Sequence, residues 1–400
     1  MSTLCLLFFI NTVESQPGCT DPLATNYNSS ATVNDGSCIY AASTVSPISS
    51  FNLPGALPES SGLIVWNNYV WTHNDNTDIN LYALDTADGS INQSYTLINT
   101  INIDWEEISQ DSNYVYVGDF GNNANGNRTD LKILRVEKNS VQSGTPLIDT
   151  ISFSYSDQVD FTPTGSNNTD FDCEAFIVST DSIYLFTKQW VNNKTRVYSV
   201  PKIPGNYAAA LRDSFDIQGL VTGATFLEQE RIVALCGYNI LLQPFVFLLY
   251  DFSGSDFFSG NKRKIGINLP FYQIEGVATA DGLKFYMANE YFSQLSVTTV
   301  QKFHIFDLSS FLGTYLTGIP SAVGKSSFLF YPNPATDVII VEIANPGANY
   351  YLHNTLGQTV KSGRLMQGNS EINIAELPGG IYFLRIEKGI SVLKVIKNNY

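Results

Sequence analysis

The stretch "CEAFIVSTDSIYLFTK" (Cys173–Lys188) joins two short apolar, aromatic runs through a polar turn, and a carboxylate, Glu174, stands at its start. Apolar β-branched and aromatic residues favour strands, whereas Ser, Thr and Asp favour the turn between them. The stretch therefore predicts two consecutive antiparallel strands. Because the same pattern recurs along the chain, it decides the fold.

Four further copies of this strand pair are present, and each pair is followed by a third apolar strand. The copies are "SSGLIVWNNYVWTHND" (Ser60–Asp75), "WEEISQDSNYVYVGDF" (Trp105–Phe120), "TGATFLEQERIVALCG" (Thr222–Gly237) and "IEGVATADGLKFYMANE" (Ile274–Glu290). The third strands are "NLYALD" (Asn80–Asp85), "LKILRV" (Leu131–Val136), "TRVYSV" (Thr195–Val200), "VFLLYD" (Val246–Asp251) and "KFHIFD" (Lys302–Asp307). Repeats spaced by roughly 45 to 70 residues are typical of four-stranded propeller blades.

We therefore expect an all-β protein with a five-bladed β-propeller over residues 43–311. The strand "ISSFNL" (Ile48–Leu53) precedes the first pair, and we expect it to complete the last blade and close the ring. The long insertion Asn139–Asn168 leaves a six-bladed ring as the alternative.

The composition excludes one class of partner. The formal net charge is -15, from 22 Lys and Arg against 37 Asp and Glu, and no basic run stands out. Binding to nucleic acid would therefore lack its main electrostatic contribution. Acidity spread along the chain suits an exported protein.

The last part of the chain, residues 327–400, alternates short apolar runs with Gly, Pro and Asn turns, which predicts a small immunoglobulin-like β-sandwich. Its motifs "YPNPATD" (Tyr331–Asp337), "LGQTVKSG" (Leu356–Gly363) and "LPGGIYFLRI" (Leu377–Ile386) closely resemble the type A C-terminal sorting domain of the type IX secretion system. The matching positions are Tyr331, Pro332, Asn333, Pro334, Gly379, Gly380 and Tyr382. The resemblance implies that residues 327–400 engage the secretion machinery, with export through the periplasm to the cell surface or medium. An ordinary adhesive domain is the alternative, and residues 312–326 are the expected linker.

The start of the chain indicates export as well. The apolar run "LCLLFFI" (Leu4–Ile10) is far shorter than the roughly 20 residues of a membrane helix, so residues 1–16 are interpreted as a signal peptide and no transmembrane segment is expected. Residues 17–42 form a polar loop with Cys19 and Cys38 at its ends, which predicts a disulfide-stapled surface module. A metal site of Asp21, Asn34 and Asp35 is the alternative. The segment also resembles a cysteine-bracketed motif of exported Bacteroidota proteins, which implies location only.

The strand pairs also predict where the functional face lies. In a propeller the innermost strands line the channel, so the starts of first strands and the ends of second strands converge at one mouth. This brings together Glu106, Glu174 and Glu275 with His73, Asp75, Asp119, Lys188 and Glu290. Clustered carboxylates require a bound cation or raised pKa values. The repeated glutamates have a structural alternative, in which they accept backbone N–H groups and pin the ring.

Residues that differ between blades are the better functional candidates. His73, Asp119, Lys188 and Glu290 are the candidate catalytic residues, and His73 could act as a general base oriented by Asp75, with a structural histidine as the alternative. Ligand binding is assigned to Asp75, Glu106, Arg128, Glu174 and Glu275. The polar loops after the second strands offer oxygen ligands for calcium, with Asp75, Asp119 and Glu290 as the candidate metal ligands. Cys173 and Cys236 are either an inter-blade disulfide or two buried thiols.

The motifs "EGVA" (Glu275–Ala278) and "CEAF" (Cys173–Phe176) resemble the openings of inner strands in bacterial phytase-like and esterase-like propellers. That resemblance implies hydrolysis of an ester or phosphoester at the channel mouth. Three functions thus follow from the sequence: binding of a small molecule or glycan at an acidic mouth, hydrolysis at the same mouth, or an adhesive or scaffolding role at the surface.

Overall fold

The computed structural model describes residues 15–294, 297–318, 328–343, 348–355, 357–366, 368–386 and 392–398. It divides into two compact units, residues 1–316 and 317–400, which are described separately. The expected signal peptide lies almost entirely outside the described residues. Among those that are described, no helix has the length and apolar character needed to cross a membrane.

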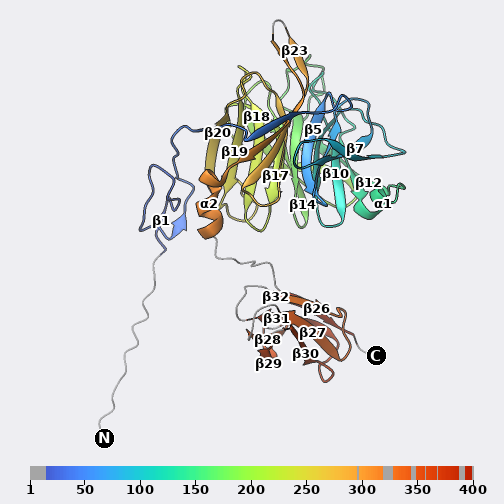
Figure 1. Cartoon of the computed structure of the whole chain (residues 1–400), viewed down its shortest axis with the longest axis vertical. Coiled ribbons are helices and arrows are strands. Elements are labelled where there is room, and N and C mark those ends of the chain that lie inside the picture. Colours follow the sequence, from blue (N-terminus) through green and yellow to red (C-terminus); the bar gives the residue numbers. More distant parts are fainter. Residues whose placement is uncertain are drawn as a thin grey trace. The chain divides into compact units, whose positions relative to one another are not determined.

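The first unit is a five-bladed β-propeller, in which each blade is built from antiparallel strands (Figure 1). The first blade holds β5 (Ser60–Trp66), β6 (Tyr69–Asn74), β7 (Asn80–Asp85) and β8 (Ile91–Thr96). The second holds β9 (Trp105–Gln110), β10 (Tyr114–Asp119), β11 (Lys132–Glu137) and β12 (Ile148–Tyr155), and the third β13 (Asp172–Val178), β14 (Ser182–Lys188), β15 (Thr195–Pro201) and β16 (Gly205–Phe215). The fourth holds β17 (Leu220–Leu227), β18 (Ile232–Tyr238), β19 (Pro244–Tyr250) and β20 (Asn261–Ile267), and the fifth β21 (Ile274–Thr279), β22 (Lys284–Asn289), β25 (Lys302–Asp307) and β4 (Ser49–Asn52).

The ring closes after five blades. The inner strands pack in the order β5, β9, β13, β17 and β21, and β21 returns to β5. As predicted, β4 pairs with β25 and completes the last blade. The insertion at 139–168 holds most of α1 (Lys138–Gln142) and the outer strand β12, which pairs in parallel with β16, so the six-bladed alternative is wrong.

The cores lie between neighbouring blades, because central strands are covered on both faces. Every residue of β13, β18 and β19 is buried, which explains why β18 and β19 are almost continuously apolar. Between the second and third blades, the ring of Phe120 meets those of Phe153 and Phe176 edge to face. Burying each such ring contributes about 1.5–3 kcal/mol, so aromatic layers hold adjacent blades together.

The N-terminal module lies against the fourth blade. It holds β1 (Pro17–Gly18) and β2 (Val33–Asn34), and β3 (Thr44–Val45) follows it and pairs with β20. The predicted disulfide between Cys19 and Cys38 is present. The Asp21 carboxylate accepts hydrogen bonds from Tyr40 at 2.7 Å and Tyr250 at 2.5 Å. Asp21 therefore anchors the module to the blade, which leaves the alternative metal site without support.

The propeller continues beyond the expected boundary at residue 311. The helix α2 (Ser309–Gly318) occupies the start of the segment that was expected to be a linker. Phe311 and Leu312 are buried against the core of the fourth and fifth blades, which explains why the chain stays packed there. Residues 319–326 of that segment lie outside the described part.

The second unit is the predicted small β-sandwich. One sheet contains β26 (Phe328–Tyr331), β27 (Val338–Ile343) and β30 (Gly368–Asn373), and the other β28 (Ala348–Asn354), β29 (Thr359–Leu365), β31 (Gly380–Ile386) and β32 (Val392–Lys397). Buried side chains from both sheets, including Ile339, Leu352 and Leu384, share one core. All described strand pairs within these two sheets are antiparallel.

Candidate functional site: the acidic channel mouth

The inner strand of every blade is irregular close to the channel mouth. Pairing with the second strand slips at Glu106, Glu174, Thr222 and Glu275, and in the first blade between Ser61 and Ile64. An extra residue of this kind breaks the strand's alternation and redirects a side chain. The three glutamates of the repeated motif are bulged residues, and all three line one pocket.

This pocket, the acidic mouth, has a volume of about 190 Å³ and receives residues from all five blades. Its lining consists of Ser61, Asp75, Asp104, Glu106, Asn123, Asn167, Glu174, Lys188, Trp190, Tyr238, Gln273, Glu275 and Glu290. Two long loops between strands supply Asn123 and Asn167, and the Asn167 N–H donates to the Asn123 carbonyl at 2.8 Å. The mouth thus holds six carboxylates and a single basic side chain among its described lining residues.

That basic side chain, Lys188, is buried and fully engaged. Its ammonium forms an ion pair with Glu174, and it lies 4.6 Å from the Trp190 ring centre and 5.3 Å from that of Tyr238. Burial lowers the pKa of Lys188, but Glu174 and the other acidic neighbours outweigh burial and hold this pKa above its usual range. Lys188 therefore neutralises one carboxylate and leaves the others unpaired.

The remaining carboxylates of the mouth have raised pKa values. Burial first, and then the charges of neighbouring acids, raise the pKa of Asp75 to about 8. Burial also raises the pKa of Glu275 to about 8 and that of Glu290 to about 7, although Lys188 opposes both shifts. Burial and the nearby Glu174 and Asp104 raise the pKa of Glu106 well above its ordinary value. Raised pKa values of this kind mark acids that have too few cationic partners.

Two side chains of the mouth carry acceptors without donors. Glu106 is 5% exposed and lines the pocket, and no described residue donates a hydrogen bond to its carboxylate. The Oε1 atom of Gln273 is also buried without a donor, while its amide group donates to the Tyr238 hydroxyl at 2.9 Å. Gly121 packs so closely on Asp104 and Glu106 that a Cβ would collide with both carboxylates. The mouth therefore offers hydrogen-bond acceptors that a ligand could satisfy.

Three of the residues predicted from the sequence, His73, Asp119 and Arg128, do not line the mouth. His73 is fully buried, its Nδ1 lies 3.0 Å from the Asn74 carbonyl oxygen, and burial lowers its pKa to about 4. Asp119 is buried beside Arg128 at 2.9 Å and Lys132 at 2.7 Å. His73 and Asp119 occupy the same register position, opposite the residue just before the bulge. This position does not line the mouth in any blade. In the third, fourth and fifth blades the next residue lines it instead, as Lys188, Tyr238 and Glu290 do, whereas Asn74 and Phe120 in the first two blades do not.

The ring-pinning role falls to Glu107, which sequence reasoning missed. Its fully buried carboxylate accepts the N–H groups of Ala224 at 2.6 Å and Ile108 at 2.9 Å, so it joins the inner strands of the second and fourth blades. The doubled glutamate in "WEEI" was the available signal. Asp104, Trp190 and Gln273 were also missed, because they lie in loops outside the repeated strands.

The two cysteines of the third and fourth blades are thiols. Cys173 and Cys236 are both buried and form no disulfide, so of the two alternatives the buried thiols are present and the inter-blade disulfide is wrong. In the described ranges, no three His, Cys, Asp or Glu side chains are arranged to hold a metal ion. Of the expected calcium ligands, Asp75 and Glu290 line the mouth and Asp119 does not.

The loops at the mouth end of the propeller carry many exposed apolar side chains. Of the fifteen large apolar side chains exposed in the described part of residues 48–318, eleven lie in the loops at this end. We call them the apolar rim: Ile98, Ile101, Ile103, Val159, Phe161, Val191, Ile240, Leu241, Phe271, Tyr291 and Val300. The other four are Ile48, Leu147, Ile203 and Leu211. The hairpin of β23 (Phe292–Gln294) and β24 (Val297–Thr299) projects at the same end, away from α1 and α2 (Figure 1).

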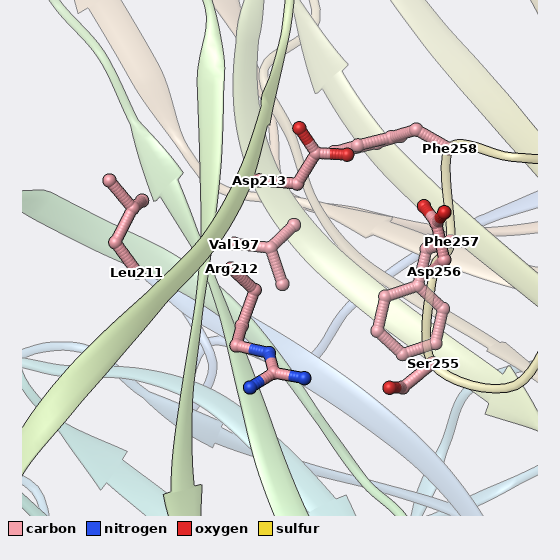
Figure 2. A pocket seen from close by; sticks show the side chains of 8 residues that line it. All are labelled: Val197, Leu211, Arg212, Asp213, Ser255, Asp256, Phe257 and Phe258. Carbon is pink, nitrogen blue, oxygen red and sulfur yellow. The ribbon is translucent and has the colours of Figure 1, made fainter.

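A larger cavity of about 490 Å³ lies on the outside, between the third and fourth blades. Figure 2 shows Arg212 and Asp213 of β16 on one side and the turn Ser255–Phe258 on the other. Arg212, Asp213 and Asp256 are all exposed to solvent. This cavity therefore lacks the buried, unsatisfied groups that distinguish the mouth.

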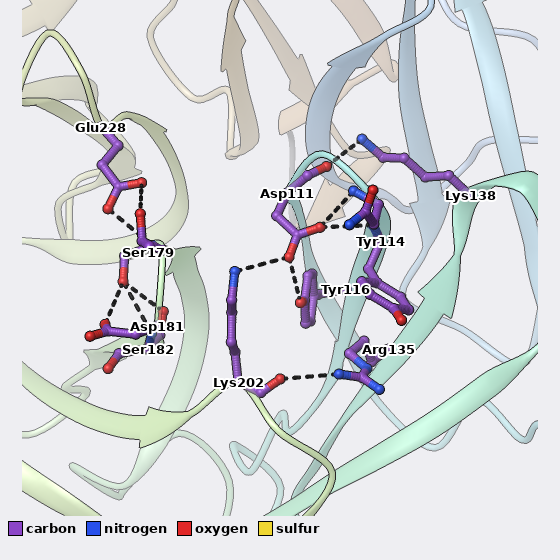
Figure 3. Close-up of polar contacts among 12 residues, drawn as sticks. Asp111, Tyr114, Tyr116, Arg135, Lys138, Ser179, Asp181, Ser182, Lys202 and Glu228 are labelled. Carbon is purple, nitrogen blue, oxygen red and sulfur yellow. Dashed lines mark hydrogen bonds and ion pairs between the residues drawn. The ribbon is translucent and has the colours of Figure 1, made fainter. Parts of the chain in front are cut away.

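At the opposite end of the propeller, formed by the turns between first and second strands, carboxylates are paired with hydrogen-bond donors and basic side chains (Figure 3). Asp111 accepts hydrogen bonds from the N–H groups of Asn113 and Tyr114 and the hydroxyl of Tyr116, and it pairs with Lys202 of the next blade at 3.1 Å. Burial alone would raise the pKa of Asp111, but these partners outweigh it and lower that pKa. Carboxylates at this end therefore serve to join blades.

Residues 329–398 match the family model described as "Secretion system C-terminal sorting domain". The second unit is therefore a sorting domain, which confirms the expectation drawn from its motifs and indicates export toward the cell surface or extracellular space. No curated protein matches the chain.

Among solved structures, the chain is similar in fold to PorZ, a bacterial surface component of the type IX secretion system of Porphyromonas gingivalis, at 12% identity and a TM-score of 0.31. That likeness covers 85% of this chain, which spans only 45% of the PorZ chain. It is also similar to a putative 6-phosphogluconolactonase from Bacteroides uniformis, at 12% identity and a TM-score of 0.31 over 80% of this chain and 90% of that one. The WD40 repeats of RRP9 match at 9% identity and a TM-score of 0.35, over 66% of this chain and all of theirs. None of these likenesses carries an argument about activity.

Proposed function

We propose that this exported propeller protein binds a cationic, donor-rich ligand in the acidic mouth. The observation that carries the proposal is a pocket lined by six carboxylates and one basic side chain, in which Glu106 receives no hydrogen bond and the buried Gln273 Oε1 lacks a donor. Unsatisfied buried acceptors cost free energy, and a ligand with several N–H groups would recover it. Charge pairing in such a water-poor site is stronger than at the surface.

The mouth suits an organic cation better than calcium or a neutral sugar. The described acidic side chains are not arranged as a metal shell, although six of them surround about 190 Å³. A neutral glycan would supply donors but could form no ion pair with the carboxylates. An ammonium or guanidinium group supplies both donors and charge.

Thermal unfolding of the full chain tests this proposal. Agmatine, which carries a guanidinium and an ammonium, should raise the unfolding midpoint at pH 7, since a ligand at a hundred times its Kd stabilises the native state by about 2.7 kcal/mol. Glu106→Gln should abolish the shift, whereas Asp213→Asn in the outer cavity should leave it unchanged. A shift with calcium after chelation, and none with agmatine, would contradict the proposal and assign the mouth to a metal.

The route of export is the second part of the proposal. A sorting domain acts after passage into the periplasm, so residues 1–16 are proposed as the segment removed on the way and residues 327–400 as the part that engages the machinery. A chain that lacks residues 326–400 should accumulate in the periplasm. Detection of that shortened chain on the cell surface by antibody labelling would refute the assignment.

Hydrolysis at the mouth is the second candidate function. Glu290 lies in the pocket with a pKa raised by burial to about 7, which suits a general acid at neutral pH. p-Nitrophenyl acetate and p-nitrophenyl phosphate are the probes. Turnover that disappears in Glu290→Gln and persists in Asp213→Asn would support an enzyme, and no turnover would leave binding as the function.

A further inference from the structure

The chemistry of the mouth and of the apolar rim together fits one kind of ligand. We infer that the mouth docks an extended polypeptide segment of a partner protein, which places a Lys or Arg side chain in the pocket and apolar side chains on the rim. This inference rests on the proposed function, because it names the ligand of the same pocket.

The pocket has the dimensions and the walls for one basic side chain. Its volume of about 190 Å³ excludes a folded element. Trp190 and Tyr238 supply aromatic surface for an aliphatic stem, and their rings already flank one ammonium, that of Lys188. Glu106 and the Gln273 oxygen supply acceptors without donors for the charged head. Lys and Arg side chains combine such a stem and head.

The rim is continuous in sequence with the pocket. Tyr238 is followed by Ile240 and Leu241, which are 76% and 69% exposed, and Gln273 is preceded by Phe271, which is 45% exposed. The two loops are joined by the Phe271 N–H, which donates to the Leu242 carbonyl at 2.8 Å. An apolar surface therefore begins two residues from the pocket on each of these loops.

These loops hold their apolar residues in a defined shape. The Asn239 side-chain oxygen accepts the N–H groups of Leu241 at 2.9 Å and Gln243 at 3.1 Å. Leu242 and Phe271 have φ angles of 53° and 73°, a region that such residues rarely occupy. Apolar side chains concentrated at one end and kept in water mark an interaction surface rather than chance exposure.

Charge selects among the partners that could cover the rim. A second copy of this chain, with a net charge of -15, would be repelled by the mouth, and so would an anionic membrane. A small amine would satisfy the pocket and leave the rim in water. A polypeptide segment with a basic residue between apolar ones complements both surfaces.

Synthetic peptides and the full chain test the inference by isothermal titration calorimetry at pH 7. The probe acetyl-Ser-Phe-Arg-Phe-Ser-amide should bind. Replacing its Arg by Gln should weaken binding at least tenfold, and replacing both Phe residues by Ser should weaken binding three- to tenfold. Agmatine serves as the probe of the pocket alone.

Variants of the protein separate the two surfaces. The double variant Ile240→Ser with Phe271→Ser should bind the Phe-containing peptide as weakly as the Ser-containing one, with agmatine binding unchanged. Leu241→Ser gives a second, milder change if the double variant fails to fold. Leu147→Ser is the matched control, because Leu147 is 65% exposed but lies at the opposite end. Glu106→Gln should weaken the binding of agmatine and of both Arg-containing peptides.

The outcomes distinguish the inference from the function on which it rests. If agmatine binds and the Phe residues add nothing, or if the rim variants leave peptide binding intact, the inference is overturned and the proposed function stands. If no probe binds, both fall. Binding to phosphatidylcholine–phosphatidylethanolamine vesicles in place of the peptides would assign the rim to a membrane and would also overturn the inference.

Discussion

The two ends of the propeller use carboxylates in opposite ways. At the end away from the mouth, Asp111 is surrounded by donors and its pKa is lowered. At the mouth, few donors surround the carboxylates, and the pKa values of Asp75, Glu275 and Glu290 are raised. Both groups sit at strand ends of the same repeated blade. The difference teaches that the repeat determines where a carboxylate lies, while the neighbouring loops determine whether donors surround it.

The sharpest test of this contrast uses two adjacent residues. Glu107→Ala should destabilise the protein by about 2–5 kcal/mol, because it leaves the buried N–H groups of Ala224 and Ile108 without an acceptor. Glu106→Ala should not destabilise it, since no described residue donates to that carboxylate. Denaturant unfolding measures the loss of stability in both variants. Equal losses would contradict the different roles proposed for Glu107 and Glu106.

At the opposite end we expect a smaller loss. Asp111→Ala removes the acceptor of two backbone N–H groups and separates Lys202 from its partner, which should cost about 1–3 kcal/mol. Urea unfolding at pH 7 gives the value. Asp149→Ala, which removes a half-exposed ion pair with Arg135, is the control and should cost less than about 1 kcal/mol.

The pH dependence of stability should be dominated by the mouth. Carboxyl groups whose pKa is higher in the folded than in the unfolded chain bind extra protons when folded, so stability falls as pH rises from about 4 to about 8. The unfolding midpoint should therefore be higher at pH 5 than at pH 8, and Glu275→Gln should reduce the difference by raising the midpoint at pH 8. An unfolding midpoint that rises from pH 5 to pH 8 would show that carboxylates with lowered pKa values, such as Asp111, dominate the pH dependence of stability.

The smallest effect is expected on the rim. Ile240→Ser and Leu147→Ser each change an exposed apolar side chain, so both should alter the free energy of unfolding by no more than about 0.5 kcal/mol. Thermal unfolding checks this. A large loss in Ile240→Ser alone would mean that the rim is part of the core rather than an interaction surface.

Much of the fold was predictable because strand pairs leave a strong local pattern. The repeated pairs predicted five blades, and "ISSFNL" predicted the closing strand, since both depend on short-range alternation and turn chemistry. The sorting domain was predictable from its motifs, and the model match confirms it.

The site was predictable only in part, because bulges and loops decide it. Placing the repeated glutamates at one mouth required only the blade geometry. His73 and Asp119 were wrongly placed at the mouth, since they occupy a strand position that does not line it in any blade, and composition does not reveal the bulge opposite. Trp190, Gln273 and Asn167 reach the mouth from loops whose paths depend on contacts between distant segments. Likewise, no local pattern distinguishes a thiol at Cys173 from half of a disulfide.

The closing strand has a consequence for how the molecule comes into being. Ser50 on β4 meets His304 on β25 at 2.7 Å, although 254 residues separate them along the chain. Contacts this distant form only after nearly the whole propeller has folded, and folds that depend on them form slowly. The early strand therefore remains without its partner until the last blade has formed, and this blade closes the ring.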